Sequence, residues 1–202
     1  MTREQFASRL LNACASVMAA EQELTEIDSK FGDADHGLTM AKIARAITEA
    51  VEDADGGIQT MLDDVAMAVM SLNGGSAVPL WNTWLDGLQE EAPEGEEIDV
   101  PGIQTIFAKA LEELNEMSGA QVGDKTMMDA LIPASEAVAA YTGDSADELF
   151  DAAAQAAAQG AEATKQYVSK FGRAKSYGTK TIGTPDAGAV SMSWFFQGLA
   201  RE

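Results

Sequence analysis

Apolar residues along the chain recur every three to four positions, the spacing of one face of an α-helix. In the first stretch Phe6, Leu10 and Ala13 follow this spacing, and Thr2 with Gln5 has the pattern of a capping box. Few segments alternate as strands do, and alanine and methionine, both good helix formers, are abundant. Glycine, proline and polar clusters separate eight expected helices, over residues 3–31, 38–54, 59–72, 76–91, 103–116, 127–141, 145–171 and 189–200. The pattern predicts an all-α protein.

Short connections between these helices predict an antiparallel, up-and-down bundle of eight helices. Alternate connections then lie at the same end of the bundle. Glycines gather in the first, third, fifth and seventh connections, at residues 32–37, 74–75, 119–123 and 172–188. The four glycine-bearing loops are therefore expected on one rim, provided that the count of eight helices is right. The polar loop over residues 92–101 is expected at the other end.

Composition and charge narrow the class of protein. The 202 residues, 46% of them hydrophobic, predict a single domain over residues 1–202. A formal charge of −20 repels nucleic acid and anionic membranes, so neither is an expected partner. No apolar run approaches the roughly 18 residues of a membrane span. No secretory signal opens the chain, so a cytoplasmic location is expected. Cys14, the single cysteine, lies on an apolar helical face and is expected to be a buried thiol.

The segment KFGDADHGLTM holds the only histidine and, with Asp28 before it, three carboxylates. Asp33 and Asp35 are two positions apart, so in an extended segment they point to the same side. Gly32 allows the chain to turn and bring Asp28 near them. Such carboxylates repel one another without a cation, and their spacing suits Mg²⁺ with substrate phosphates better than an EF-hand. The alternatives are that Asp33 and Asp35 are helix caps and His36 a turn residue, or that the loop binds Ca²⁺ incidentally.

Three other features suit an anionic ligand. His36 leads into a helix N-terminus, whose free N–H groups attract phosphate. The stretch NGGSA at residues 73–77 also opens a helix, although it lacks the lysine of a P-loop. Five of the 13 basic residues lie between Lys165 and Lys180, among them Arg173. Met127 and Met128 of GDKTMMDAL are placed to line an apolar slot for the base of a nucleotide. Each feature alone has an ordinary structural explanation, but together on one rim they indicate a Mg²⁺-nucleotide site.

Four stretches, in this order, resemble the nucleotide-binding subunit L of dihydroxyacetone kinases, the DhaL family. They are GDADHGLTM, GGSAVPL, GDKTMMDAL and GRAKSYGTKTIGTPDAGA. The resemblance implies an antiparallel barrel of eight helices with the nucleotide, ADP or ATP, at one rim. It also implies that two Mg²⁺ ions are held by Asp28, Asp33 and Asp35. The implied nucleotide contacts are His36, Gly37, Leu38, Thr39, Ser76, Ala77, Gly119, Met127, Arg173, Asp186, Ala187 and Gly188.

The same resemblance implies that the chain is half of a kinase and needs partners. The ketose would be held on a histidine of a separate K subunit, so no catalytic base is expected in this chain. The donor would be exchangeable ATP, or ADP rephosphorylated by a phosphotransferase-system phosphocarrier subunit M. The alternative function is a non-catalytic nucleotide-carrying module that docks on a phosphocarrier or a transcription regulator. Neither the donor, nor the ketose (triose or tetrose), nor the oligomeric state follows from the sequence.

Three positions depart from the pattern of the family. Val78 stands where a glycine is usual, Thr184 replaces a histidine, and Ala187 replaces a proline. These changes concern the loop expected to cap the nucleotide and the helix start opposite it. They bear on the donor mode and leave the three aspartates untouched.

Overall fold

The structure, a computed structural model, describes residues 1–201, and in this range it contains α-helices, two 3₁₀ segments and no strand. The all-α prediction is confirmed. The α-helices are α1 (Arg3–Ala19), α2 (Glu21–Asp28), α3 (His36–Asp53), α4 (Ile58–Met70), α5 (Ala77–Glu90), α6 (Val100–Ser118), α7 (Met128–Ala140), α8 (Ala146–Ala163) and α9 (Ala187–Leu199). The 3₁₀ segments are η1 (Thr164–Gln166) and η2 (Arg173–Thr181).

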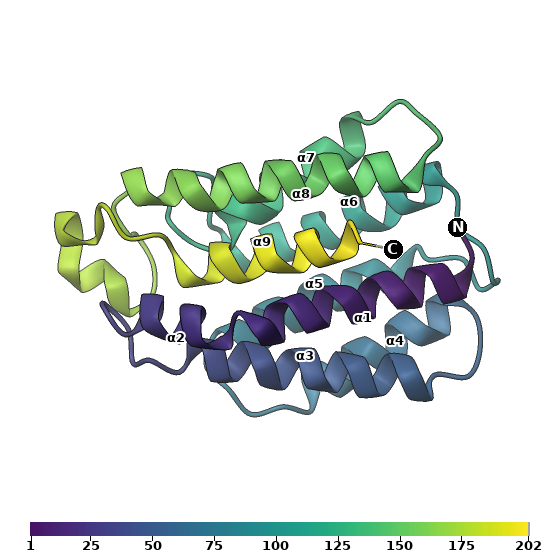
Figure 1. The fold of residues 1–202 in the computed structure, drawn as a ribbon, viewed down its shortest axis with the longest axis horizontal. Coiled ribbons are helices and arrows are strands. Elements are labelled where there is room, and N and C mark those ends of the chain that lie inside the picture. The colour runs from purple at the N-terminus through teal and green to yellow at the C-terminus, as the bar shows by residue number, and fades with distance from the viewer. Residues whose placement is uncertain (202) are drawn as a thin grey trace.

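The long helices form a closed antiparallel ring. α1 packs against α3, and α3 against α4, and each later helix then packs against the one before it. α9 contacts both α8 and α1 and thereby closes the ring. In Figure 1, α8, α9, α1 and α3 form the front of this barrel, and α4 to α7 form its back. The fold is therefore the barrel that the sequence predicts, with α1 and α2 together taking one place in it.

Aromatic side chains fill the interior of the ring. Trp84 is fully buried and makes edge-on or tilted contacts with Trp81, Phe107, Phe195 and Phe196, at ring-centroid distances of 5.5 to 6.2 Å. Such contacts add stabilisation to the burial of large apolar surfaces. The barrel interior is thus a filled core.

The single cysteine lies in that core, as the sequence predicts. Cys14 has no exposed surface and forms no disulfide. Burial raises the pKa of its thiol to about 12. Because the thiolate is the reactive form, Cys14 is inert at neutral pH.

Several predicted boundaries differ from those in the structure; the fifth expected helix, for example, begins at Val100 instead of residue 103. The first expected helix divides at Ala20 into α1 and α2, but the chain continues in the same direction, so the alternation of ends is preserved (Figure 1). The seventh ends at Ala163 instead of continuing to residue 171, because Tyr167 is already extended (φ −98°, ψ 154°). The expected long loop after it contains η2, which is kinked at Gly178 (φ 55°, ψ −132°).

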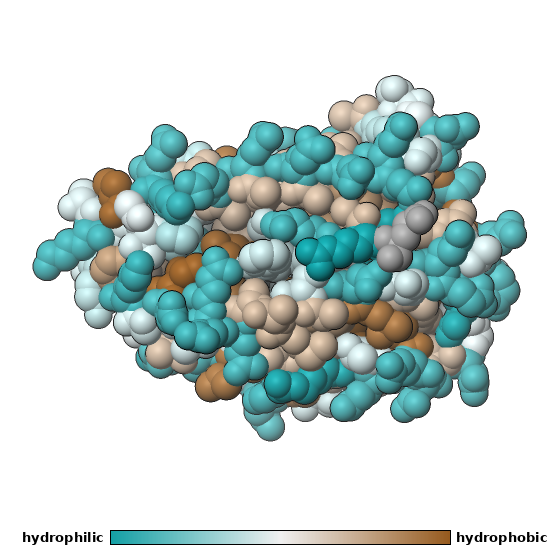
Figure 2. All heavy atoms as spheres, in the orientation of Figure 1, coloured by the Kyte–Doolittle hydropathy of each residue, from teal (hydrophilic) through white to brown (hydrophobic). Residues whose placement is uncertain are grey.

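The loops gather at two ends of the barrel, as the alternation of connections predicts. Residues 29–35, 71–76, 119–127 and 164–186 lie at one end, called here the rim. The turns over residues 54–57, 91–99 and 141–145 lie at the far end with the N-terminus. Figure 2 shows a largely hydrophilic face, with several hydrophobic side chains toward the rim. No helix of the described residues has the length and apolar character needed to cross a membrane.

Candidate nucleotide and metal site

Asp28, the last residue of α2, connects the acidic loop to the start of α3. Its Oδ2 accepts the backbone N–H groups of Asp35 (3.1 Å) and His36 (3.4 Å). Asp35 occupies the N-cap position of α3, but its own carboxylate makes no capping hydrogen bond. The interpretation of Asp35 as an ordinary helix cap is therefore wrong, since Asp28 takes that role from the neighbouring helix.

The three carboxylates converge as the sequence predicts, but through a turn instead of an extended segment. Ligand oxygens of Asp28, Asp33 and Asp35 all lie within 4.8 Å of one another. Ala34 between them adopts the left-handed conformation (φ 61°), which is strained for a residue with a Cβ. A Cβ at Gly32 would clash with the Asp28 carboxylate, so glycine is required for this approach.

The electrostatics of the acidic loop favour a bound cation. Desolvation by its neighbours raises the pKa of Asp35, and the negative charges of Asp33 and Asp28 raise it further. Arg173 opposes this shift and forms an ion pair with Asp33, at an N–O distance of 2.7 Å. The Arg173 side chain is 71% exposed, so this pair is weakened by water. Three hard oxygen donors at this separation match the ligands that Mg²⁺ or Ca²⁺ prefers.

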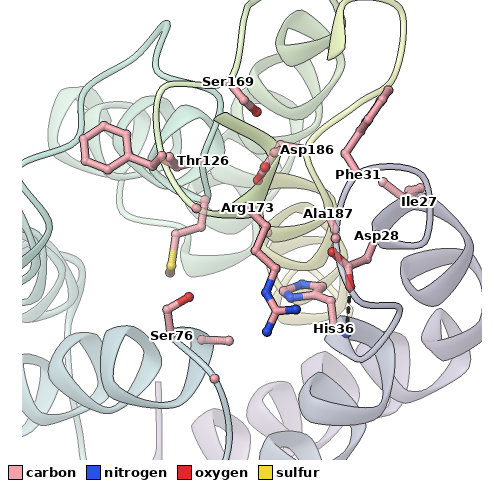
Figure 3. A pocket seen from close by; sticks show the side chains of 18 of the residues that line it. Ile27, Asp28, Phe31, His36, Ser76, Thr126, Ser169, Arg173, Asp186 and Ala187 are labelled. Atoms are coloured by element: carbon pink, nitrogen blue, oxygen red, sulfur yellow. Dashed lines mark hydrogen bonds between the residues drawn. The ribbon is translucent and has the colours of Figure 1, made fainter. Parts of the chain in front are cut away.

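These carboxylates form one wall of a cavity of about 340 Å³. All four rim loops contribute to its lining, and α3, α5, α7 and α9 all begin beside it. Figure 3 shows Arg173 extending across the cavity between Ser76 and the side that carries Asp28 and His36. Helix N-termini carry partial positive charge and free N–H groups. The cavity therefore presents carboxylates for a cation next to helix starts that suit phosphate.

His36 is held as a neutral hydrogen-bonding group. Its Nε2 lies 3.2 Å from the Ser191 hydroxyl, and the ring also bonds to the Ala187 backbone. Burial lowers the pKa of the ring, an effect that Asp28 only partly offsets. The ring bridges the starts of α3 and α9 beside the carboxylates and is poorly placed to act as a base.

The cavity brings together most of the predicted site residues. The twelve that line it are Asp28, Asp33, Asp35, His36, Thr39, Ser76, Ala77, Met127, Arg173, Asp186, Ala187 and Gly188. Three predicted residues do not line it. Gly37 is buried against α2, Leu38 is 58% exposed, and Gly119 ends α6 in the left-handed conformation (φ 61°).

Other residues of the cavity wall were not predicted from the sequence. Apolar examples are Ile27, Phe31, Leu80, Trp81 and Phe171, which come from α2, α5 and the rim loops. They come from separate segments of the chain, and nothing in the local sequence indicates that they share one wall. Lys125 also lines the cavity; it lies in the motif GDKTMMDAL, where nothing in the sequence indicates a role for it.

Burial also shifts the pKa of a carboxylate on the opposite wall. Asp186 precedes α9 and accepts the Ala189 N–H at 2.8 Å. Burial, more than any charge, raises the pKa of Asp186 to about 7; Asp129 adds to the shift and Lys125 opposes it. Asp186 is therefore only partly ionised at neutral pH.

The comparisons with known proteins agree on one family. The DAK2 domain matches residues 30–201. The chain is 30% identical over 203 residues to the ADP-binding subunit DhaL of the PEP-dependent dihydroxyacetone kinase 1 of Listeria innocua, and the match covers 98% of this chain and 96% of that subunit.

Longer relatives match the chain over one part of their length. It is 35% identical over 201 residues to the L-erythrulose kinase of Pectobacterium atrosepticum, covering 94% of this chain and 33% of that protein. The dihydroxyacetone kinase of C. freundii, crystallised with AMP-PNP and Mg²⁺, superimposes with a TM-score of 0.72 at 26% identity, over 96% of this chain and 33% of that one. The chain thus spans about a third of the length of these kinases.

Proposed function

The chain belongs to the DAK2 domain family, and from this premise we propose that it is the nucleotide-binding subunit of a two-component ketose kinase. In this role a single domain carries ADP or ATP with Mg²⁺ and presents it to a ketose held on a separate K subunit. The observation that carries the proposal is the convergence of three carboxylates on the wall of a cavity ringed by helix starts. The names of the DhaL subunit and of the crystallised kinase, with its AMP-PNP and Mg²⁺, support it.

Asp28, Asp33 and Asp35 are the proposed ligands for two Mg²⁺ ions. Their oxygens lie within 4.8 Å of one another. Desolvation, and then the negative charges of Asp33 and Asp28, raise the pKa of Asp35, and a bound cation would relieve the repulsion between these charges. When bound, Mg²⁺ supplies charge neutralisation for the nucleotide phosphates, which phosphoryl transfer needs more than covalent chemistry. Asp28 has a second task, because it also fixes the start of α3 through two backbone N–H groups.

The helix starts around the cavity are the proposed phosphate side of the site. His36 and Thr39 in the first turns of α3 and Ser76 and Ala77 at the start of α5 line the same cavity. Their position next to the carboxylates lets N–H dipoles and metal ligands act on one polyphosphate. Arg173, now 2.7 Å from Asp33, is near enough to steady an anionic group between the two walls.

The proposed base of the reaction belongs to the partner. The chain's only histidine is His36, whose pKa is lowered by burial and whose ring is engaged with Ser191 and Ala187. It is unsuited to hold a ketose covalently. The K subunit therefore supplies both the ketose and the proton acceptor, and this chain positions the nucleotide.

Reconstitution tests the proposal. The chain is mixed with a K subunit of a DhaL-dependent kinase, ATP and Mg²⁺, with dihydroxyacetone or erythrulose as acceptor. We expect ATP consumption that requires both proteins and one ketose, and that is lost when Asp33→Asn and Asp35→Asn are combined. Consumption that continues without this chain, or that is absent for both ketoses while ADP is bound, would contradict the kinase assignment. The preferred ketose follows from the two initial rates.

A second candidate is a nucleotide-carrying module that docks on a phosphocarrier or a regulator. It is favoured by the similarity to a subunit named for binding ADP within a PEP-dependent kinase, matched over nearly its whole length. The reconstitution above separates this module from the kinase, since ATP consumption that needs both proteins supports the kinase. If the chain is a kinase subunit, the exchange rate of bound nucleotide discriminates between a phosphocarrier and ATP as the phosphoryl donor. ADP that survives gel filtration indicates a retained cofactor rephosphorylated by a phosphocarrier, whereas rapid exchange indicates ATP as the donor.

A further inference from the structure

Lys125, in the loop between α6 and α7, is a buried cation to which the proposed function assigns no task. Its side chain is 4% exposed, and its backbone is left-handed (φ 62°) although it is not glycine. Its ammonium group donates to four backbone carbonyl oxygens, those of Thr164 (2.7 Å), Tyr167 (3.2 Å), Thr181 (2.9 Å) and Thr184 (2.6 Å). An ammonium has three protons, so these four acceptors share them.

The four carbonyls belong to both arms of the segment over residues 164–186, called here the strap. Thr164 and Tyr167 lie on the arm that leaves α8, and Thr181 and Thr184 on the arm that leads to α9. The hydroxyls of Thr164 and Thr181 also join the arms, through the N–H groups of Asp186 (2.9 Å) and Ser169 (3.1 Å). The Lys125 ammonium therefore sits at the neck of the strap.

Beyond this neck, the strap reaches the acidic loop. Arg173 pairs with Asp33, and the Tyr177 ring lies 5.2 Å from that of Phe31. Both contacts are made by exposed side chains of the strap. Since such contacts are individually weak, the position of Arg173 depends on how firmly the neck is held.

The surroundings of Lys125 favour its charged form less than water does, yet they resemble a cation site. Desolvation lowers its pKa, and the negative charges of Asp186 and Asp129 oppose that shift. Backbone carbonyl oxygens are also ligands for hard cations. Lys125 thus acts as a cation tethered from one rim loop within a ring of carbonyls from another.

We propose that Lys125 is a positioning residue of the nucleotide site: its ammonium joins the two arms of the strap and so holds Arg173 and Asp186 at the cavity. The effect on nucleotide affinity rests on the proposed function. The effect on the order of the strap does not, so the two can fail separately.

Lys170 offers a matched control, because it also links these two loops. Its Nζ pairs with Asp124 Oδ1 at 2.6 Å and its N–H bonds to the Asp124 carbonyl at 3.1 Å. The Lys170 side chain is 61% exposed, and it does not line the cavity. Removing its charge deletes an ion pair between the same segments, exposed on the Lys170 side, and leaves the neck intact.

The experiment compares the wild type with Lys125→Met, Lys125→Ala and Lys170→Met. Hydrogen exchange of residues 164–186 is measured without nucleotide, and the affinity for ADP with Mg²⁺ by calorimetry. We expect faster exchange across the strap in both Lys125 variants and wild-type exchange in Lys170→Met. If the strap is ordered in about a tenth of the molecules, affinity falls about tenfold, since apparent affinity scales with the competent fraction.

Chemical rescue separates positioning from a merely structural role. Propylammonium replaces the atoms that Lys125→Ala lacks, and the cavity lining includes Lys125. Added propylammonium should restore protection of the strap and nucleotide affinity in Lys125→Ala but change neither in the wild type. Wild-type exchange in Lys125→Met would overturn the proposal, as would unfolding of the whole barrel in both Lys125 variants. If the wild type binds no ADP, the proposed function fails, and strap exchange still decides the role of Lys125.

Discussion

At the far end of the barrel the loops close against one another, whereas at the rim they leave a cavity of about 340 Å³. The start of α4 donates two backbone hydrogen bonds to the loop over residues 91–99, from Ile58 N–H to the Gly95 carbonyl (2.9 Å) and from Gln59 N–H to the Pro93 carbonyl (3.1 Å). A Cβ at Gly57 would clash with the Glu94 carbonyl, so two backbones touch there. Gly57 lets two backbones touch at the far end, whereas Gly32 makes room for the Asp28 carboxylate at the rim.

The two ends also differ in how they use acidic residues. The far-end loop over residues 91–99 has five carboxylates, against three over residues 28–35. Within the described chain, however, only the three rim carboxylates have ligand atoms that converge within 4.8 Å. The difference shows that the turn at Ala34 and the position of Asp28 on α2, and not the number of acidic residues, create the candidate metal site.

Removing carboxylates should affect nucleotide affinity at the rim and not at the far end. Asp33→Asn combined with Asp35→Asn should lower the affinity for ADP with Mg²⁺ by about 100-fold or more, because loss of even an indirect metal contact costs about 10- to 100-fold. Glu94→Gln with Glu96→Gln is the control at the far end and should leave affinity unchanged. Calorimetry measures both, and circular dichroism checks the helical fold. Equal losses in the two double variants would mean that net charge, and not the site, governs binding.

The second prediction compares two aspartates that cap helices. Asp186 caps α9 at the rim, and exposed Asp99 caps α6 at the far end by accepting the Gly102 N–H at 2.8 Å. The folded protein keeps the Asp186 proton up to a pKa of about 7, above the ordinary value of 3.8. Between about pH 4 and pH 7 the folded state therefore binds more protons than the unfolded state, and stability falls as pH rises.

Asp186→Asn removes the part of the pH dependence of stability that comes from the Asp186 carboxyl group. The free energy of unfolding of the wild type minus that of the variant should fall by about 1 kcal/mol per pH unit within this window, and level off above it. Urea unfolding at several pH values measures the difference. Asp99→Asn is the control for the loss of a helix cap at an exposed position, and a difference between the wild type and Asp186→Asn that does not change with pH would contradict the effect of burial on Asp186.

The third prediction contrasts two glycines. Gly57→Ala should lower the free energy of unfolding by about 1 to 3 kcal/mol, the usual cost of forcing extra volume into close-packed structure. The affinity for ADP should not change. Gly32→Ala should instead lower the affinity for ADP with Mg²⁺ and change the free energy of unfolding little. Its Cβ would displace the Asp28 carboxylate, which lies at an open rim. Chemical denaturation and calorimetry of both variants test this, and a loss of stability without loss of affinity in Gly32→Ala would be inconsistent with it.

The smallest expected effect concerns the link across the cavity mouth. Arg173→Ala should lower the free energy of unfolding by less than about 1 kcal/mol, since exposed ion pairs contribute little. Nucleotide affinity should nevertheless fall, because the guanidinium faces the cavity. Thermal denaturation and calorimetry give the two values. A large stability loss would show that the Arg173–Asp33 pair holds the rim together, and not the neck at Lys125.

The sequence predicts the barrel and the rim well, because both depend on periodicity and on the order of the loops. The break at Ala20 adds a helix without reversing the chain, so the rim survives the miscount. The convergence of Asp28, Asp33 and Asp35 is also predictable, but the reason given for it is wrong. A left-handed alanine, and not an extended segment, turns Asp33 and Asp35 to one side.

Lys125 shows what sequence reasoning could not reach. Its acceptors lie 39 to 59 residues later in the chain, and all of them are backbone carbonyls, which carry no side-chain signature. Its left-handed backbone is equally invisible in composition or spacing. The apolar wall residues Trp81 and Phe171 could not be predicted either, because they come from separate elements that meet only in the folded chain. Features that depend on tertiary contacts between loops require the structure.

Every proposal for the rim depends on its binding a nucleotide through a cation held by Asp28, Asp33 and Asp35. Calorimetric titration of ADP into the wild-type chain, first with Mg²⁺ and then with EDTA, measures this dependence. We expect saturable binding of one ADP per chain with Mg²⁺ and an affinity at least about tenfold weaker without it. No binding with Mg²⁺, or the same affinity with EDTA, would contradict it.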